Sequence, residues 1–144
     1  MPQTPSSHYL ALDVGAARVG LAIASTEARL ARPLTTLKND ESIFAKLKEL
    51  ISESKVNRLV IGLPRGLEGQ ETEQTSQVRQ FASELKTSLV LPIHFQDEAV
   101  TSIRAEEELK ARGRPYNKED VDALSATYIL EDFLQQGDNN EIFT

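Results

Sequence analysis

The feature that most constrains the fold is the segment Tyr9–Ala24, in which two short apolar runs flank a tight turn, Gly15–Arg18. Apolar runs of this length around a glycine-bearing turn predict a β-hairpin. Asp13 falls within the first run, among residues that a strand of this kind would bury. A carboxylate close to a sheet core is costly unless a cation or hydrogen-bond donors satisfy it, so the hairpin predicts a partner for Asp13.

The rest of the chain alternates between strand-like and helical patterns. Further strands are expected at 30–38, 58–62 and 91–98, the first of them at an edge or bulged because it contains Pro33. Apolar residues at helical spacing predict helices across 43–51, 78–85 and 121–133, and a highly charged helix ends near 112. Asn117 and Asp120 approximate a capping box for the last helix. The order β-β-β-α-β-α-β-α-α indicates the α/β class, with a mixed five-stranded sheet flanked by helices on both faces.

Length and composition bound the class of protein. With 144 residues, 40% of them hydrophobic and 26% charged, the chain has the size and balance of one globular domain. We expect a disordered lead over 1–8, one domain over 9–136 and a flexible tail over 137–144. No apolar run approaches the roughly 20 residues that span a bilayer, and the lead lacks the regions of a signal peptide. Together with the absence of cysteine, this predicts a cytoplasmic protein without disulfides or thiolate zinc sites.

Acidic residues lie where the pattern of strands and helices predicts a ligand site. In open α/β sheets such sites gather beyond the carboxyl ends of the strands. Asp13 lies near the end of the first strand, and Asp97 and Glu98 close the last one. Asp122 lies in the first turns of the last helix and projects from its packed side. A shared divalent cation is the simplest common explanation, and oxygen ligands without His or Cys suit Mg²⁺ or Mn²⁺, which support phosphodiester cleavage.

Each acid also has a simpler interpretation, and the residues alone leave it open. Asp13 could hydrogen-bond the amides of the turn that follows it. Asp97, Glu98 and Asp122 could be helix N-terminal acids favoured by the macrodipole, and for Asp97 this is the stronger of the two interpretations. Composition and spacing therefore leave a metal site as one of two explanations.

The net charge of −6 argues against a nucleic-acid coat protein, because such proteins are usually basic. It does not exclude a nuclease, since metal ions neutralise carboxylates and a local rim of arginines can hold phosphates. Glycines in the loop Gly62–Gly69 would let the backbone approach a phosphate, and the segment 112–116 would bring two guanidinium groups and an aromatic ring close to Asp122. The candidate substrate contacts are Arg18, Gly62, Arg65, Gly66, Arg112, Arg114 and Tyr116.

Four motifs in register resemble the YqgF-type (RuvX-like), Holliday-junction-resolvase-like nuclease family across about residues 9–134. The matching segments are Asp13–Ala22 for its opening motif, Gly62–Pro64 with Gly69 for its central loop, Asp97–Glu98 with Thr101 for its acidic strand end, and Val121–Ala123 with Ala126 for its last-helix motif. Two positions depart from the family pattern. Ala99 stands where the family commonly has arginine, and Gly66 stands where its central loop usually carries asparagine.

The resemblance implies an RNase H-like fold, with Asp13, Glu98 and Asp122 as catalytic residues and ligands of the divalent metal. It implies a nuclease that trims the 5′ end of the precursor of 16S ribosomal RNA. As partners we expect structured RNA and ribosomal particles, and we expect the protein to be a monomer or weak dimer. A Holliday-junction DNA resolvase, which needs a stable dimer, and a non-catalytic RNA-binding assembly factor are the alternatives. An ATPase-like module is a more distant one, because 144 residues leave no room for the duplicated half that it needs.

Overall fold

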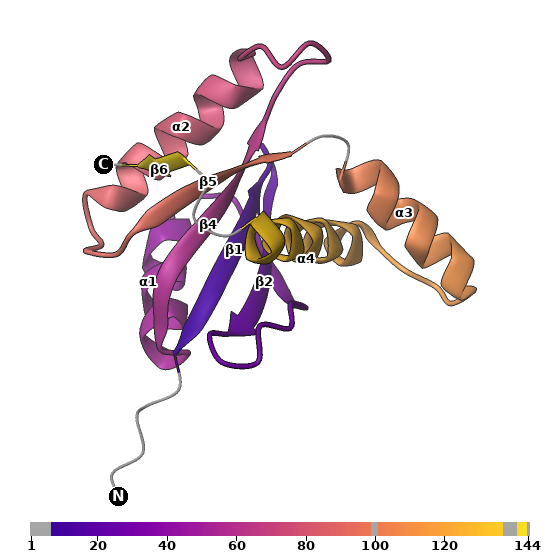
Figure 1. The fold of residues 1–144 in the computed structure, drawn as a ribbon, viewed down its shortest axis with the longest axis horizontal. Helices are drawn as coiled ribbons and strands as arrows, with labels where there is room; N and C mark the ends of the chain where they lie inside the picture. Colours follow the sequence, from indigo (N-terminus) through magenta and orange to yellow (C-terminus); the bar gives the residue numbers. More distant parts are fainter. Residues whose placement is uncertain (1–6, 99–100, 137–140, 144) are drawn as a thin grey trace, which may run out of the picture.

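The computed structural model describes residues 7–98, 101–136 and 141–143, which build one sheet with helices on both faces (Figure 1). The strands are β1 His8–Val14, β2 Arg18–Ser25, β3 Arg32–Lys38, β4 Val56–Pro64, β5 Ile93–Glu98 and β6 Glu141–Phe143. The helices are α1 Ile43–Glu53, α2 Glu73–Lys86, α3 Thr101–Arg112 and α4 Lys118–Gln136. The predicted α/β class and the predicted order of elements up to α4 are confirmed. In this part of the chain no helix has the length and apolar character that crossing a membrane requires.

The sheet is mixed, in the order β3-β2-β1-β4-β5-β6. β1, β4 and β5 run parallel, while β2, β3 and β6 pair antiparallel with their neighbours. In the predicted hairpin β1 pairs with β2, and Asp13 stands opposite Gly20. Because parallel strands end at the same edge of a sheet, β1, β4 and β5 bring Asp13, Pro64 and Glu98 to one edge.

The structure differs from the predicted strand pattern at both ends of the chain. Residues 141–143, expected in a flexible tail, pair with β5 as a sixth strand, so that prediction is wrong for these residues. Three residues are too few to show a periodic pattern, and the unpaired edge of β5 favours their extended conformation. β1 begins at His8, which we expected in the disordered lead. Residues 1–6, 137–140 and 144 lie outside the described residues, so the division into lead, domain and tail stays a prediction.

The strand β3 forms one edge of the sheet, as Pro33 predicted. Its pairing with β2 shifts register between Leu21 and Ala22, where Pro33 is the partner of Ala22. Proline has no N–H to donate to a ladder, so an edge strand with an irregularity accommodates it. Beyond the shift, β3 stays in register to Lys38, which pairs with Arg18 at the end of the hairpin.

Side chains of different size fill the two faces of the sheet. Under α1 and α2 the core consists of large residues, among them Leu12, Leu21, Leu47, Ile61, Phe81 and Phe95. Under α4 the strands contribute mostly alanines, which are Ala11, Ala22 and Ala24. α3 packs on α4 through a smaller cluster that includes Leu109 and Leu124. Because strand residues alternate between the faces, Asp13, two residues after Ala11, lies on the α4 face.

The start of α4 is held by hydrogen bonds that the sequence partly predicted. The backbone N–H of Asn117 donates to the Asp120 carboxylate at 3.0 Å, and the backbone N–H of Asp120 donates to Asn117 Oδ1 at 2.9 Å, which confirms the capping box. The Thr36 hydroxyl on β3 donates to the carbonyl of Glu119 at 2.7 Å. These bonds fix the first turns of α4, where Asp122 lies, against the sheet.

Candidate active site

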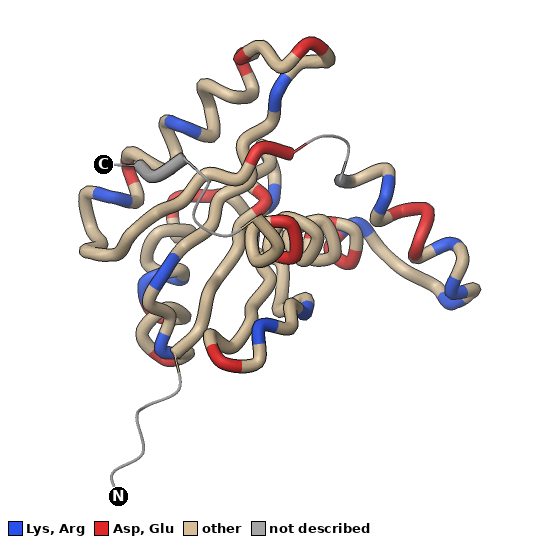
Figure 2. The backbone as a smooth tube through the Cα atoms, viewed as in Figure 1, with Lys and Arg blue, Asp and Glu red and all other residues tan. Residues whose placement is uncertain are grey.

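Three acidic side chains from separate elements reach the carboxyl edge of the sheet. Asp13 is the next-to-last residue of β1, Glu98 ends β5, and Asp122 lies near the start of α4. Glu98 follows Gln96 by two residues, and the Gln96 amide donates to Gln136 of α4 at 3.1 Å, so Glu98 shares the α4 face with Asp13. Figure 2 shows acidic positions at the end of β5 and on α4. We call Asp13, Glu98 and Asp122 the acidic site.

The charges of these three residues act on one another. Burial, together with the negative charges of Glu98 and Asp122, raises the pKa of the half-buried Asp13 from its usual 3.8 to about 8. Like charges shift a pKa measurably only when they lie within several ångströms, because water and salt screen longer distances. The structure therefore brings together the three acids that the sequence proposed as one site.

Gly20 lets α4 approach the sheet at the acidic site. Gly20 pairs with Asp13 across the hairpin. A Cβ built on it would collide with the backbone carbonyl of Asp122, so the backbones of β2 and α4 touch at this position. In the sequence, Gly20 stands out only as part of the opening motif. A glycine inside a predicted strand is a signal of close backbone approach that could have identified it.

Gly62 is tightly packed between β4, α4 and the acidic site. It lies inside β4, and a Cβ on it would meet the Ile129 side chain at 2.5 Å and the Glu98 carboxyl carbon at 3.1 Å. The strand predicted over 58–62 is confirmed but continues to Pro64, so the loop that was predicted to start at Gly62 begins only after Pro64. The missing side chain instead leaves space for Glu98 between β4 and α4. Gly62 therefore allows the Glu98 carboxyl group to take its position at the acidic site. Its role as a substrate contact stays a prediction.

Arg18 lies at the border of the acidic site. Its Nε donates to Asp122 Oδ2 at 2.5 Å, and both side chains are partly exposed. The hydrogen bond and the negative charge of Asp122 raise the pKa of the Arg18 guanidinium. Arg18 thus places a permanent positive charge beside the acids, where it could hold a phosphate, and that contact stays a prediction.

The adjacent acids Asp97 and Glu98 face opposite sides of β5. Asp97 is exposed, and its Oδ1 accepts a hydrogen bond from Arg65 Nε at 3.2 Å. Arg65 also pairs with Glu71 at 3.4 Å. Strand alternation therefore directs Glu98 to the acidic site and excludes Asp97 from it. Arg65, a predicted substrate contact, lies at the same edge of the sheet and is engaged by two carboxylates.

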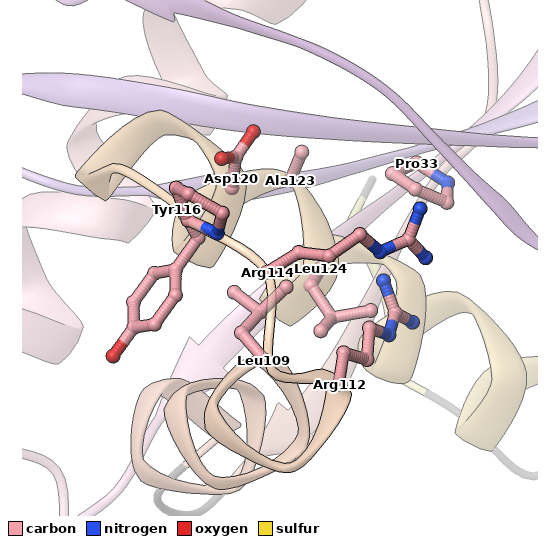
Figure 3. A pocket seen from close by; sticks show the side chains of 9 residues that line it. Pro33, Leu109, Arg112, Arg114, Tyr116, Asp120, Ala123 and Leu124 are labelled. Atoms are coloured by element: carbon pink, nitrogen blue, oxygen red, sulfur yellow. The ribbon is translucent and has the colours of Figure 1, made fainter.

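A pocket of about 310 Å³ opens between α3, α4 and β3 (Figure 3). It is lined by Pro33, Leu109, Arg112, Arg114, Pro115, Tyr116, Asp120, Ala123 and Leu124. In Figure 3 the side chains of Arg112 and Arg114 extend toward Pro33. Arg112 also pairs with Glu108 at 2.6 Å. The pocket combines an apolar floor with two guanidinium groups and one aromatic ring.

This pocket lies on the other side of α4 from the acidic site. Successive helix residues are turned by about 100°, so a helix that faces the pocket with Asp120, Ala123 and Leu124 directs Asp122 away from it. The segment 112–116 thus borders the side of α4 that the Asp122 side chain does not face, and its closeness to Asp122 stays a prediction. Closeness in sequence between a loop and a helix residue does not determine which side of the helix the loop contacts. As substrate contacts, Arg112, Arg114 and Tyr116 stay a prediction.

Comparison with known proteins shows the family. The profile of the RuvX family, described as Holliday junction resolvase, matches residues 7–136. The chain belongs to the RuvX family. A protein of Maridesulfovibrio salexigens is 41% identical over 129 residues, which cover 87% of this chain and 96% of the relative. A protein of Sulfurihydrogenibium sp. is 38% identical over 132 residues, covering 90% and 91%. Both relatives are described as candidate pre-16S rRNA nucleases.

Solved structures of RuvC share the fold of this RuvX chain. Thermus thermophilus RuvC in complex with a Holliday junction substrate superposes with a TM-score of 0.60 at 15% identity, over 95% of this chain and 99% of that one. A second RuvC structure of the same organism gives a TM-score of 0.55 at 12% identity, over 94% and 99%. The predicted RNase H-like fold is thereby confirmed.

The acidic site of this RuvX protein fits a hard divalent cation in its chemistry. All three donors are carboxylates, they converge on one edge, and their mutual repulsion is expressed in the raised pKa of Asp13. Among the described residues, however, no three His, Cys, Asp or Glu side chains are oriented so that they could all coordinate one metal ion. Asp122 instead meets Arg18. A cation would therefore compete with Arg18 for Asp122.

The two departures from the family pattern fall at different places. Gly66 lies in the connection between β4 and α2, and a Cβ on it would collide with the amide of Gln70. The asparagine that the family pattern usually has at this position would therefore require a rearranged turn. Ala99 lies outside the described residues.

Proposed function

We propose that this RuvX-family protein is a metal-dependent nuclease that hydrolyses phosphodiester bonds and processes the 5′ end of pre-16S rRNA. One observation carries the proposal: three carboxylates from separate elements, Asp13 of β1, Glu98 of β5 and Asp122 of α4, lie at the carboxyl end of the sheet on its α4 face. Such a cluster of acids destabilises the fold unless a cation neutralises it, so its presence indicates a functional rather than a structural role for these residues. The names of the relatives support the substrate.

In this mechanism Asp13, Glu98 and Asp122 would together hold Mg²⁺ or Mn²⁺. When bound, the cation supplies Lewis-acid stabilisation of the negative charge that develops on the phosphodiester oxygens. Arg18 can bind a non-bridging oxygen of the same phosphate, since its guanidinium lies beside Asp122. Gly20 and Gly62 leave the space in which Asp122 and Glu98 take their positions.

The remaining basic residues fit contacts with flanking RNA. Arg114 and Arg112 line the pocket behind α4, and Tyr116 is partly exposed at its rim. A strand that passes over α4 from the acidic site would reach this pocket, where the arginines can neutralise its phosphates and Tyr116 can stack on a base. Arg65 and Gly66 lie away from this pocket, in the connection between β4 and α2. The protein would then act in the cytoplasm on precursor rRNA, either free or in ribosomal particles.

The test uses precursor rRNA with a native 5′ extension, incubated with purified protein in Mg²⁺, in Mn²⁺ and in chelator. We expect cleavage that depends on the metal, and a loss of at least about 100-fold in Asp13→Asn and Asp122→Asn. Asp132→Asn, the same substitution ten residues along α4, is the matched control and should cleave normally. Binding of the RNA without metal-dependent cleavage would contradict the nuclease and favour a non-catalytic assembly factor.

The description of the matching family profile favours a second candidate, a Holliday-junction DNA resolvase. Symmetric cleavage of two strands requires two active sites, hence a stable dimer. Light scattering of the purified protein, with and without a four-way DNA junction, tests this candidate. A strict monomer that leaves the junction uncut would exclude it.

A further inference from the structure

A short turn between β4 and α2 presents an apolar side chain to solvent. We call residues 65–72 the Leu67 turn, after Leu67, whose relative exposure is 102%. Figure 1 shows this connection projecting beyond the end of the sheet at which β5 also ends. Single exposed apolar residues are common and need no explanation by themselves. The surroundings of Leu67 distinguish it from such residues.

The turn is braced by hydrogen bonds within itself. The Gly66 N–H donates to the carbonyl of Gln70 at 2.8 Å, and the Gly69 N–H donates to the carbonyl of Gly66 at 2.9 Å. The Glu68 N–H donates to Gln70 Oε1 at 2.9 Å. Gly69 adopts a positive φ of 82°, and the missing side chain of Gly66 leaves the space that the Gln70 amide occupies. The backbone around Leu67 is therefore ordered although the Leu67 side chain contributes no burial.

The base of the turn is tied to the strand that carries Glu98. Arg65 pairs with Asp97, the residue immediately before Glu98, and with Glu71. Arg79 of α2 holds Glu71 with hydrogen bonds of 2.7 and 3.1 Å. Because the Leu67 turn is connected to the end of β5 by these ion pairs, Leu67 keeps a defined position relative to the acidic site.

The charges of the turn favour a base over a phosphate as its contact. Arg65 is engaged by the carboxylates of Asp97 and Glu71, and Glu68 adds one further negative charge. Because the arginines here are paired with carboxylates, the tip of the turn offers little attraction to a phosphate backbone, whereas the face of an unpaired base is apolar and uncharged. A second copy of this chain or a protein partner would be expected to cover more apolar area than one leucine.

We propose that Leu67 stacks on an unpaired base of the RNA substrate next to the cleaved phosphodiester, and so selects the boundary between single-stranded and paired RNA. This inference rests on the proposed nuclease function. Apolar side chains inserted beside a base stabilise an unstacked or terminal step, because they replace the neighbouring base in the stack. A rigid turn reduces the ordering cost of such a contact.

The chain has no tryptophan, so a single Leu67→Trp substitution creates a unique fluorescent reporter. It is introduced into the Asp13→Asn variant, which keeps the RNA uncut, and titrated with a hairpin RNA that carries a single-stranded 5′ extension. Val90→Trp is the matched control, because Val90 is also fully exposed, at 101%, and precedes β5 at the end opposite to Glu98. We expect quenching by stacking at position 67 and none at position 90. RNA binding without quenching at position 67 would overturn the proposal.

A second measurement keeps the proposal independent of the reporter. Leu67→Ala should weaken RNA binding about 10- to 100-fold, the range expected when one leucine side chain is no longer buried against an apolar surface, while Val90→Ala changes it less than about twofold. An RNA with an abasic nucleotide at the stacked position should bind the wild-type protein more weakly by the same factor. The same RNA should bind Leu67→Ala no more weakly than the intact RNA does. Equal RNA affinity of Leu67→Ala and Val90→Ala would refute the contact. Quenching of Trp fluorescence at position 67 by single-stranded DNA but not by the hairpin RNA would also refute it.

The two proposals fail in different ways. If the wild-type protein does not cleave precursor rRNA but position 67 is quenched, the nuclease is wrong and the base contact stands. If the wild-type protein cleaves and Leu67→Ala cleaves and binds equally well, the base contact is wrong and the nuclease stands. Leu67 is exposed, so circular dichroism and thermal unfolding of its variants should match the wild type.

Discussion

The two faces of the sheet differ in how closely helices approach it. Under α1 and α2, large side chains such as Leu47 and Phe81 keep the helices at a distance from the strands. Under α4, alanines and Gly20 bring the helix backbone into contact with β2. Only the second face carries the acidic site. The close approach is what allows a side chain as short as Asp122 to reach the neighbourhood of Asp13.

Because of this difference, one face of the sheet mainly contributes stability and the other mainly positions the acidic site. The large-residue face provides most of the apolar burial and should tolerate changes without altering the acidic site. The alanine face contributes less burial, but its geometry sets the positions of Asp122 and Glu98. The following substitutions test this separation, in order of decreasing effect on stability.

Leu47→Ala on α1 should lower the free energy of unfolding by about 2–5 kcal/mol, because Leu47 is fully buried and its removal leaves a cavity. Urea denaturation measures the loss. Cleavage per folded molecule should stay within about twofold of wild type, since the acidic site lies on the other face. A collapse of activity beyond the unfolded fraction would show that the two faces are not independent.

Gly20→Ala should lower the free energy of unfolding by about 1–3 kcal/mol, because the new methyl group meets the backbone of Asp122 rather than a movable side chain. Here activity should fall more than the folded fraction does, since Asp122 is displaced. Ala22→Gly, on the same strand and face, removes a methyl group and serves as the control with nearly normal activity. Equal activity of the two variants would break the link between close packing and the site.

Asp13→Asn should raise the free energy of unfolding in chelator by about 1–2 kcal/mol, because it removes a charge that burial and two neighbouring acids disfavour. The folded-state pKa of about 8 lies above the ordinary 3.8, so folding favours the protonated form. Wild-type stability therefore falls as pH rises between these values, and the gain from Asn is larger at pH 8 than at pH 5. Thermal unfolding at both pH values measures it; a stability loss at pH 8 would contradict the repulsion.

The hairpin and the amphipathic helices could be predicted because their signals are local. Two apolar runs around Gly15–Arg18 specify β1 and β2, and Asn117 with Asp120 specifies the start of α4. The choice between Asp97 and Glu98 followed from the family motif, and strand alternation now gives its physical reason. The roles of Gly20 and Gly62 were missed, because what a missing side chain makes room for depends on residues far away in the chain.

By itself the sequence determined the class of fold, the order of its elements up to α4 and the three acids worth testing, because periodicity and residue chemistry are carried by neighbouring residues. Only the tertiary structure decided that β6 completes the sheet, that the basic pocket lies behind α4, and that the Leu67 turn is braced against β5. The physical reason is the same in each case. Which surfaces meet depends on how strands pair and helices pack across long separations, and no local pattern encodes that.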